Sequence, residues 1–412
     1  MSSTPHSPLA PRRVGIMLRH IRAPGGMNVI NRHLVRFLAT HPDGVEYHLL
    51  YSSPDQHQAF ADLDVRAVVL PSPSRFHWDQ VVVPRYARAA GLDLVINGKF
   101  SIPLSCRAAT MSFIPGAEQL VVPRLFPRGD RFYNRVMLPV FCRSAAAIVT
   151  CTEIGKQDIV RLTGADPGQV HVVPLGVDPW LRPATAAEKE SLRQRYHLPR
   201  PYVLFLGGIA PLKNVGNLLR AFALLPADLS VDLVMAGFKR WLFKDDLDLI
   251  QSLNLESRVH QIGFVPDADL AALYSAAECL VLPSWYEGFG IPIVEAMACG
   301  CPVVTSERGC GPEVAGGAAL LVDPASPEAI ADGIHRVLTD ASVRERQITA
   351  GFRRAAQFDW EATTRQLAGL IATLLDSPPP RRSPRAVVDQ TVGSLTRVAA
   401  SIIGLLGGLL AI

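Results

Sequence analysis

The chain has 412 residues, of which 49% are hydrophobic and 19% are charged, so it can form two globular domains and is too apolar for a disordered protein. Lys and Arg outnumber Asp and Glu by only 41 to 37, which gives no argument for a nucleic-acid partner. The seven cysteines form no C-x-x-C pair, and their odd number argues against a disulfide framework or a zinc site and favours a reducing cytoplasm.

Residues 1–12 form a polar tail without the apolar core of a secretory signal. After this tail, short runs rich in Val, Ile and Leu show little polar alternation, which is typical of strands buried on both faces. These runs are 14–18, 67–70, 94–96, 147–150, 202–206, 233–236, 279–282, 303–305 and 319–322. Helical patterns lie between them, including 27–40, 217–225, 327–338 and a helix for which Asp267 is the expected N-cap.

Alternating strands and helices predict an α/β protein built from parallel βαβ units. The series runs twice, with a break at 174–183 where Pro, Gly and Trp interrupt the pattern, followed by a charged helix over 186–196. We therefore predict two doubly wound domains, 13–183 and 184–358, and a final amphipathic helix over 359–376. In such folds a ligand binds in the crevice at the carboxyl ends of the strands.

The C-terminal residues comprise a basic, Pro-rich linker over 377–391 and an apolar tail over 392–412. Residues 398–412 carry no charge, but a helix of that length reaches only about 22 Å, short of the ~30 Å hydrocarbon core. We expect this segment to lie in a membrane surface, where the basic linker would meet anionic lipid. The alternative is a helix docked on the protein's own surface.

In the first domain, Gly25 and Gly26 follow the first strand, where they form either a turn near a phosphate or acceptor, or a simple connecting loop. The stretch 124–135 carries four arginines among aromatic residues. It is interpreted as a solvated helix face rather than as a site for an anionic, lipid-linked acceptor.

The second domain has a glycine-rich turn after its first predicted strand, with Gly207 and Gly208 at its start and Lys213 at the entrance of the next helix. The spacing is not that of a P-loop. At this place an ammonium group can meet a diphosphate as a point charge.

The most informative turn follows the predicted strand 279–282 and leads into a helix that has Pro292 at or near its start and Glu295 in its first turn. Glycines let backbone N–H groups approach phosphate oxygens, and a helix start adds free N–H donors. Carboxylates suit sugar and ribose hydroxyls, so we expect Glu287 beside the transferred sugar and Glu295 beside the ribose. The candidate donor-binding residues of this turn are Gly288, Phe289, Gly290, Ile291 and Glu295.

Two further strand ends, at Gly237 and at Phe264 and Val265, would put backbone next to a nucleobase edge, although ordinary strand ends look the same. Three Asp-x-Asp triplets begin at Asp62, Asp246 and Asp267, but none sits in a glycine-rich turn after an apolar strand. We therefore predict no required metal, because Lys213 and helix ends supply positive charge.

With these residues the chain resembles family 4 of the glycosyltransferases, the "group 1" transferases with the GT-B fold. The resemblance covers roughly 14–375, and segments 173–178, 295–304 and 311–314 also match the family. Glu287 and Glu295 match the family's pair of glutamates, which are separated by seven residues. The resemblance implies two Rossmann-like domains facing a cleft, a C-terminal helix that crosses back to the first domain, and a site without metal or cofactor.

The resemblance further implies a retaining transferase that moves a hexose, such as mannose, from a nucleotide-diphosphate sugar to a glycan or lipid-linked acceptor in polysaccharide or glycoconjugate synthesis. Glu287 and Lys213 would then act in catalysis. The first domain would hold the acceptor, near Gly25, Gly26, Gly116 and Glu118. Such a protein would work in the cytoplasm, at the inner face of the cytoplasmic membrane.

Three residues depart from the family pattern. Gly208 and Leu212 occupy the two places where an arginine usually accompanies the lysine, and Pro115 replaces a histidine that touches the transferred sugar. These departures favour an alternative, a weak or inactive nucleotide-sugar-binding subunit of a polysaccharide assembly complex. A nucleotide-sugar epimerase on the same fold is a second alternative.

Overall fold

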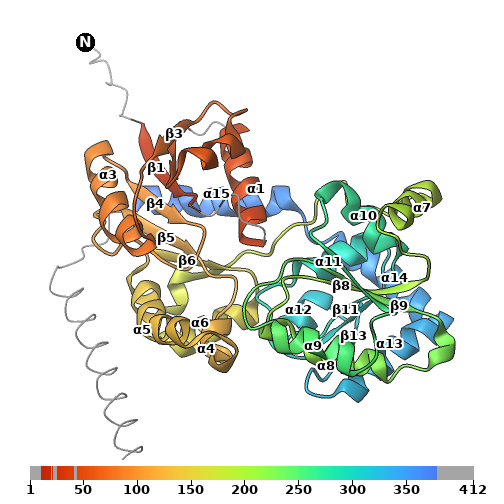
Figure 1. The fold of residues 1–412 in the computed structure, drawn as a ribbon. Coiled ribbons are helices and arrows are strands. Elements are labelled where there is room, and N and C mark those ends of the chain that lie inside the picture. Colours follow the sequence, from red (N-terminus) through yellow and green to blue (C-terminus); the bar gives the residue numbers. More distant parts are fainter. Residues whose placement is uncertain (1–10, 20, 22–25, 41–43, 378–412) are drawn as a thin grey trace, which may run out of the picture.

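A computed structural model describes residues 11–19, 21, 26–40 and 44–377, which form two parallel β-sheets covered by helices (Figure 1). The first sheet has the order β3-β2-β1-β4-β5-β6-β7 and the second the order β10-β9-β8-β11-β12-β13. The strands of the first sheet are β1 Arg12–Met17, β2 Val45–Tyr51, β3 Arg66–Val69, β4 Leu94–Asn97, β5 Ala109–Phe113, β6 Ala147–Thr150 and β7 Val170–Val172. The strands of the second sheet are β8 Tyr202–Leu206, β9 Asp232–Ala236, β10 Val259–Gly263, β11 Cys279–Leu282, β12 Val303–Ser306 and β13 Leu320–Val322.

Each sheet is covered on its faces by helices, so its central strands are buried in the way that their apolar composition predicts. The two units, coloured red to yellow and green to blue in Figure 1, lie next to each other, as the resemblance to the GT-B fold implies. The longer helices are α1 Gly26–Thr40, α3 Val83–Ala90, α5 Arg128–Ser144, α6 Glu153–Thr163, α7 Ala186–Arg195, α8 Val215–Ala223, α9 Lys244–Ser252, α10 Asp267–Ala276, α11 Ile291–Ala298, α13 Pro327–Thr339, α14 Ala341–Ala355 and α15 Trp360–Asp376.

The nine strands predicted from apolar runs are confirmed, whereas β2, β5, β7 and β10 do not correspond to any of those runs. These strands mix polar residues with apolar ones, and the fold satisfies the polar groups inside. In β2, for example, the buried His48 ring makes hydrogen bonds with Tyr86 and Glu46. Such partners come from distant segments, so a local pattern cannot reveal them.

Two local predictions are corrected. Pro266, with extended backbone, takes the N-cap position of α10, so Asp267 is the first helical residue and not the cap. Glu295 is the fifth residue of α11 and lies beyond its first turn, because the helix already begins at Ile291. The prediction that Ser326 caps α13 is confirmed, since its hydroxyl accepts a hydrogen bond from the Ala329 N–H.

The chain passes between the two sheets twice. After β7 it runs through 173–185 to α7, and α15 later returns to pack against α1 of the first unit (Figure 1). At this crossing the His33 and Trp360 rings stack with centroids 3.9 Å apart, and the Thr363 hydroxyl donates a hydrogen bond to the Pro174 carbonyl. Both crossings together tie the two units to each other.

No helix within the described residues has the length and apolar character needed to cross a membrane. Most of the polar tail, most of the basic linker and the segment 398–412, for which we predict membrane contact, lie outside the described residues.

Gly176 provides a test of the crossing. A Cβ at this position would lie 2.2 Å from the Trp360 backbone nitrogen, so Gly176→Ala must push the two crossing segments apart. We expect a loss of about 1–3 kcal/mol in the free energy of unfolding, measured by urea denaturation. Gly369→Ala is the matched control, because nothing lies within 4 Å of its added Cβ on an exposed face of α15 and alanine favours the helix. Equal stability of the two variants would contradict this packing.

Candidate active site

The turn after β11 has the geometry that its sequence predicts. The strand ends at Leu282, the chain turns through Glu287 and Gly288, and α11 begins at Ile291. Gly290 adopts a left-handed conformation with φ of 76°, which glycine reaches without a steric penalty. The first turn of α11 therefore leaves backbone N–H groups for an anion at the carboxyl end of the second sheet.

Lys213 and Glu287 form an ion pair across two neighbouring strand ends. Lys213 ends the short helix η5 Pro211–Lys213 after β8, and its Nζ lies 2.5 Å from Glu287 Oε1. The side chains are 20% and 14% exposed, respectively, so both remain within reach of a ligand. The Ser284 hydroxyl donates a second hydrogen bond to the same carboxylate oxygen at 2.6 Å. Sequence reasoning missed Ser284, although its place three residues before Glu287 in the same turn was a usable signal.

Three glycines link the ends of β8, β9 and β10: Gly207 and Gly237 directly follow β8 and β9, and Gly263 is the last residue of β10. Gly207 N–H donates to the Ala236 carbonyl, and Gly237 N–H donates to the Gly263 carbonyl. Gly237 has a φ of 133°, and a Cβ there would lie 2.0 Å from the Gly207 oxygen, so these strand ends pack closer than a side chain allows. Beside them, the exposed rings of Phe238 and Phe264 stack with centroids 5.1 Å apart.

Some predicted donor residues are buried and can offer only backbone groups. Phe289 is 3% exposed and packs edge-to-face on Phe358, and Val265 is 6% exposed in the core. The Ile291 side chain points toward the first unit, because a Cβ added to Gly26 would lie 2.9 Å from its Cδ1 atom. Gly25 lies outside the described residues.

Arg240 occupies the space over Gly208. A Cβ at Gly208 would lie 2.9 Å from Arg240 Cγ and 3.1 Å from its Nε. A short ladder holds the segment, because Ile209 N–H donates to the Phe238 carbonyl and Arg240 N–H donates to the Ile209 carbonyl. The glycine thus admits a guanidinium group from a distant segment. Sequence reasoning missed Arg240, since nothing local indicates this approach.

The first unit forms the opposite wall, through the loop that follows β5. The backbone of Pro115 lies so close to Gly288 that a Cβ on Gly288 would approach the Pro115 carbonyl carbon to 2.7 Å. Across the same seam the Thr152 hydroxyl donates to the Gly288 carbonyl, and Glu313 accepts hydrogen bonds from the Glu153 and Ile154 N–H groups at the start of α6. The two walls are therefore in backbone contact at Gly288, and hydrogen bonds from Thr152 and to Glu313 join them on either side of this contact.

Glu118, at the start of the short helix α4 Glu118–Val121, faces this seam. Its Oε2 is shut off from solvent and has no hydrogen-bond partner among the described residues. Burial, together with the negative charge of Glu287, raises the pKa of Glu118 to about 7, and Lys213 opposes the shift. The structure thus brings Glu118, Glu287 and Lys213 into one electrostatic neighbourhood.

Glu295 lies in a different neighbourhood. It accepts a hydrogen bond of 2.7 Å from the Tyr274 hydroxyl, and its pKa is raised to about 7 by burial and by the negative charges of Asp178 and Asp267. These aspartates make ion pairs with His33 and Arg32 of α1, with nitrogen–oxygen distances of 3.2 Å and 3.8 Å. Glu295 therefore faces the side of the crevice where α1 lies.

The raised pKa of Glu118 predicts a pH-dependent stability. A carboxyl group whose pKa is higher in the folded state favours folding below pH 4.5, and this contribution is lost as the pH rises through about 7. Glu118→Gln should remove up to about 3 kcal/mol of this pH dependence, measured as the free energy of unfolding between pH 4.5 and 8. The pH dependence that comes from the raised pKa of Glu295 should remain in this variant. The exposed Glu256→Gln is the control, and an unchanged profile for Glu118→Gln would contradict the burial of this carboxyl group.

Comparisons with known families and proteins agree with this architecture. The family described as "Glycosyltransferase Family 4" matches residues 24–181, and the family described as "Glycosyl transferases group 1" matches residues 188–354. The chain is 36% identical to O-antigen chain mannosyltransferase B of Escherichia coli over 280 residues. This match covers 66% of this chain and 73% of that protein.

Two more distant similarities extend the comparison. MMP alpha-(1->4)-mannosyltransferase of Mycolicibacterium hassiacum is 34% identical over 245 residues, which is 58% of this chain and 57% of that protein. Among solved structures, Anabaena HepE in complex with UDP and glucose superposes with a TM-score of 0.73 at 19% identity. That match covers 88% of this chain and all of HepE, and at this identity it shows the fold.

Proposed function

Because this chain belongs to the group 1, family 4 glycosyltransferases, we propose that it transfers a hexose, mannose in the first place, from a nucleotide-diphosphate sugar to a glycan or lipid-linked acceptor with retention of anomeric configuration. The observation that carries the proposal is the Lys213–Glu287 pair beside the start of α11. Mannose is supported by the names of the two similar mannosyltransferases.

In the proposed complex, the donor diphosphate lies against the second unit. Lys213 supplies an ammonium group, the start of α11 supplies backbone N–H groups, and Arg240 supplies the guanidinium for which neither Gly208 nor Leu212 provides a side chain. Cations and helix starts stabilise a diphosphate most when it leaves, because its charge then increases. The exposed Phe238 and Phe264 rings beside the strand ends suit a nucleobase face.

Glu287 has a second role in this proposal. While Lys213 turns toward the diphosphate, the Glu287 carboxylate accepts hydrogen bonds from sugar hydroxyls and faces the positive charge that develops on the sugar ring. Ser284 keeps this carboxylate in place. The bond from the anomeric carbon to the diphosphate oxygen breaks on the same face on which the acceptor oxygen attacks, and the departing diphosphate takes the acceptor's proton.

The inactive-subunit alternative rests on Pro115, Gly208 and Leu212. Of these, Pro115 offers no side-chain donor at the place of the family's histidine. Glu118 stands three residues further on, next to Glu287, and its raised pKa allows it to donate a hydrogen bond near neutral pH. Slow hydrolysis of the nucleotide sugar in the absence of acceptor would argue against a binding subunit. Analysis of the reaction products would then distinguish a transferase from an epimerase.

We expect Lys213→Ala and Glu287→Ala each to lower the rate of sugar transfer about 10²–10³-fold, since each removes a charge that acts in the transition state. The measurement is the initial rate with GDP-mannose, UDP-glucose and related donors, with thermal unfolding as a folding check. Lys189→Ala, on α7, is the control. Rates of both site variants within twofold of the wild type would exclude these roles.

Arg240→Met tests whether the Arg240 guanidinium contacts the diphosphate of the donor. Losing one guanidinium should raise the dissociation constant of GDP or UDP about tenfold, which corresponds to one charged hydrogen bond. Isothermal titration with nucleotide diphosphate and nucleoside makes the comparison, because the nucleoside lacks the diphosphate and should bind both proteins equally. Equal diphosphate affinity would place Arg240 outside the donor site.

A further inference from the structure

The ion pair of the candidate active site lies beyond the point where the ladder of the second sheet ends. The ladder between β8 and β11 has Leu204 and Leu280 as its last pair, whereas the two strands run on to Leu206 and Leu282. The strand order of the sheet reverses here, which is where the crevice of an open α/β sheet forms. Contacts beyond the ladder must therefore set the distance between the two turns.

Asn214, the residue after Lys213, has a side chain that does not cap its own helix. It occupies the N-cap position of α8 in a left-handed conformation, with φ of 58°, and its side chain makes no cap hydrogen bond. Asparagine tolerates this conformation better than most residues. An N-cap asparagine ordinarily accepts a hydrogen bond from an N–H group in the first turn of its helix. The Asn214 side chain therefore serves another purpose.

The Asn214 amide joins two loops. Its Nδ2 atom donates hydrogen bonds to the Pro283 carbonyl at 3.0 Å and to the Pro324 carbonyl at 2.6 Å. An asparagine amide has two N–H groups, so both are engaged, and the residue is only 6% exposed. Asn214 is therefore a buried link between loops rather than a ligand of the donor.

The bond to Pro283 is one of two that hold the residues on either side of Lys213. On the other side, the Leu212 carbonyl accepts a hydrogen bond of 2.9 Å from the Trp285 N–H. Both bonds end in the turn after β11, which carries Glu287. Because a lysine side chain is flexible, these two bonds to its neighbours restrict where its ammonium group can meet the carboxylate.

The loop after β13 contributes to the same support. Pro324 lies in this loop, and Asp323 beside it forms an ion pair of 2.9 Å with Arg308. The Arg308 guanidinium lies over the Trp285 ring, 5.5 Å from the ring centroid. The segments that Asn214 joins are therefore also in contact with each other, so the amide closes a ring of contacts at the turn after β11.

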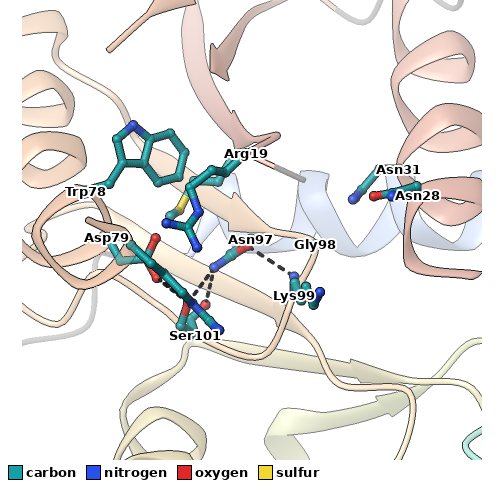
Figure 2. A pocket seen from close by; sticks show the side chains of 11 residues that line it. Arg19, Asn28, Asn31, Trp78, Asp79, Asn97, Gly98, Lys99 and Ser101 are labelled. Carbon is teal, nitrogen blue, oxygen red and sulfur yellow. Dashed lines mark hydrogen bonds and ion pairs between the residues drawn. The ribbon is translucent and has the colours of Figure 1, made fainter. Parts of the chain in front are cut away.

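An asparagine supports a lysine-bearing loop in the first unit as well. After β4 the Asn97 amide donates to the Ser101 carbonyl and hydroxyl oxygens, and its Oδ1 atom accepts a hydrogen bond from the Lys99 N–H (Figure 2). Ser101 lies four positions from Asn97, whereas the partners of Asn214 lie 69 and 110 positions away. The first asparagine shapes one loop, and the second joins separate loops.

We propose that Asn214 is a positioning residue for sugar transfer, which holds Lys213 at the distance from Glu287 that the donor requires. This inference rests on the proposed function, because it takes Lys213 and Glu287 as the groups that act on the donor. Without the amide, the turn after β8 would keep the bond between Leu212 and Trp285 but could pivot about it. A displacement of about 1 Å in a catalytic group can lower a rate about 10²-fold.

The first experiment is Asn214→Gly, since glycine keeps the left-handed backbone and removes the amide. We expect the initial rate of sugar transfer to fall about 10–100-fold. Asn217→Ala is the matched control, because Asn217 lies within α8 and donates to the same Pro324 carbonyl at 3.0 Å. A rate of Asn214→Gly within twofold of the wild type, or an equal loss in Asn217→Ala, would overturn the proposal.

A double-mutant cycle separates positioning from a general loss of stability. If Asn214 acts through Lys213, adding Asn214→Gly to Lys213→Ala should lower the rate less than about twofold, because the group to be positioned is already gone. A further loss as large as that of the single variant would overturn the proposal. If Asn214→Gly unfolds at the assay temperature, Asn214→Asp takes its place, since aspartate also tolerates the left-handed conformation and its carboxylate cannot donate.

Binding measurements distinguish the failure of this proposal from the failure of the transferase function. Asn214→Gly should weaken the binding of GDP and UDP about threefold or more in isothermal titration, whereas the nucleosides should bind it as they bind the wild type. If this loss is found but the wild type neither hydrolyses nor transfers any donor sugar, the transferase function fails and the positioning role stands. If Lys213→Ala weakens diphosphate binding and transfer but Asn214→Gly changes neither, the positioning role fails and the function stands.

Discussion

The arrangement of the crevice depends on one contact between backbones, the approach of Pro115 and Gly116 in the first unit to Gly288 in the second. Side chains at either glycine would collide with the opposite wall, since each Cβ would come within 3 Å of it. This contact puts Glu118 next to the turn that carries Glu287, and Thr152 and Glu313 hold the seam from both sides. A second close backbone contact lies where the helix α15 crosses back to the first unit, because Gly176 leaves room there for Trp360. The two sheets therefore face each other at a distance that backbone atoms determine.

Charge within this seam is balanced locally. Lys213 and Glu287 neutralise each other in the structure, and the raised pKa of Glu118 lets a third charged group become neutral near pH 7. In the proposed reaction, a diphosphate takes over Lys213 and leaves Glu287 to the sugar. Arg240 lies over Gly208, and its positive charge also acts on Lys99 in the loop after β4 of the first unit.

Local sequence patterns were sufficient for most of the fold. Unbroken apolar runs such as β8 and β11 mark strands covered on both faces, and Ser326 followed by Pro327 marks a helix start, because these signals come from neighbours in the chain. The strand β2 escaped prediction because Glu46 and His48 interrupt its apolar pattern, and their partners lie far away in the chain. Helix boundaries shifted by a residue or more for Asp267 and Glu295, since the start of a helix depends on backbone conformation as well as composition.

The sequence by itself determined the class of the protein, its two parallel sheets and the glycine turns that carry Lys213 and Glu287. These features depend on residues that are close together in the chain. The tertiary structure alone decided which groups meet across the crevice. It put Arg240 over a glycine 32 positions earlier, Glu118 beside Glu287, and Lys99 with Arg19 and Arg75 around one pocket. The physical reason is that electrostatic and steric contacts depend on distance in space, and packing of two separately formed sheets sets that distance.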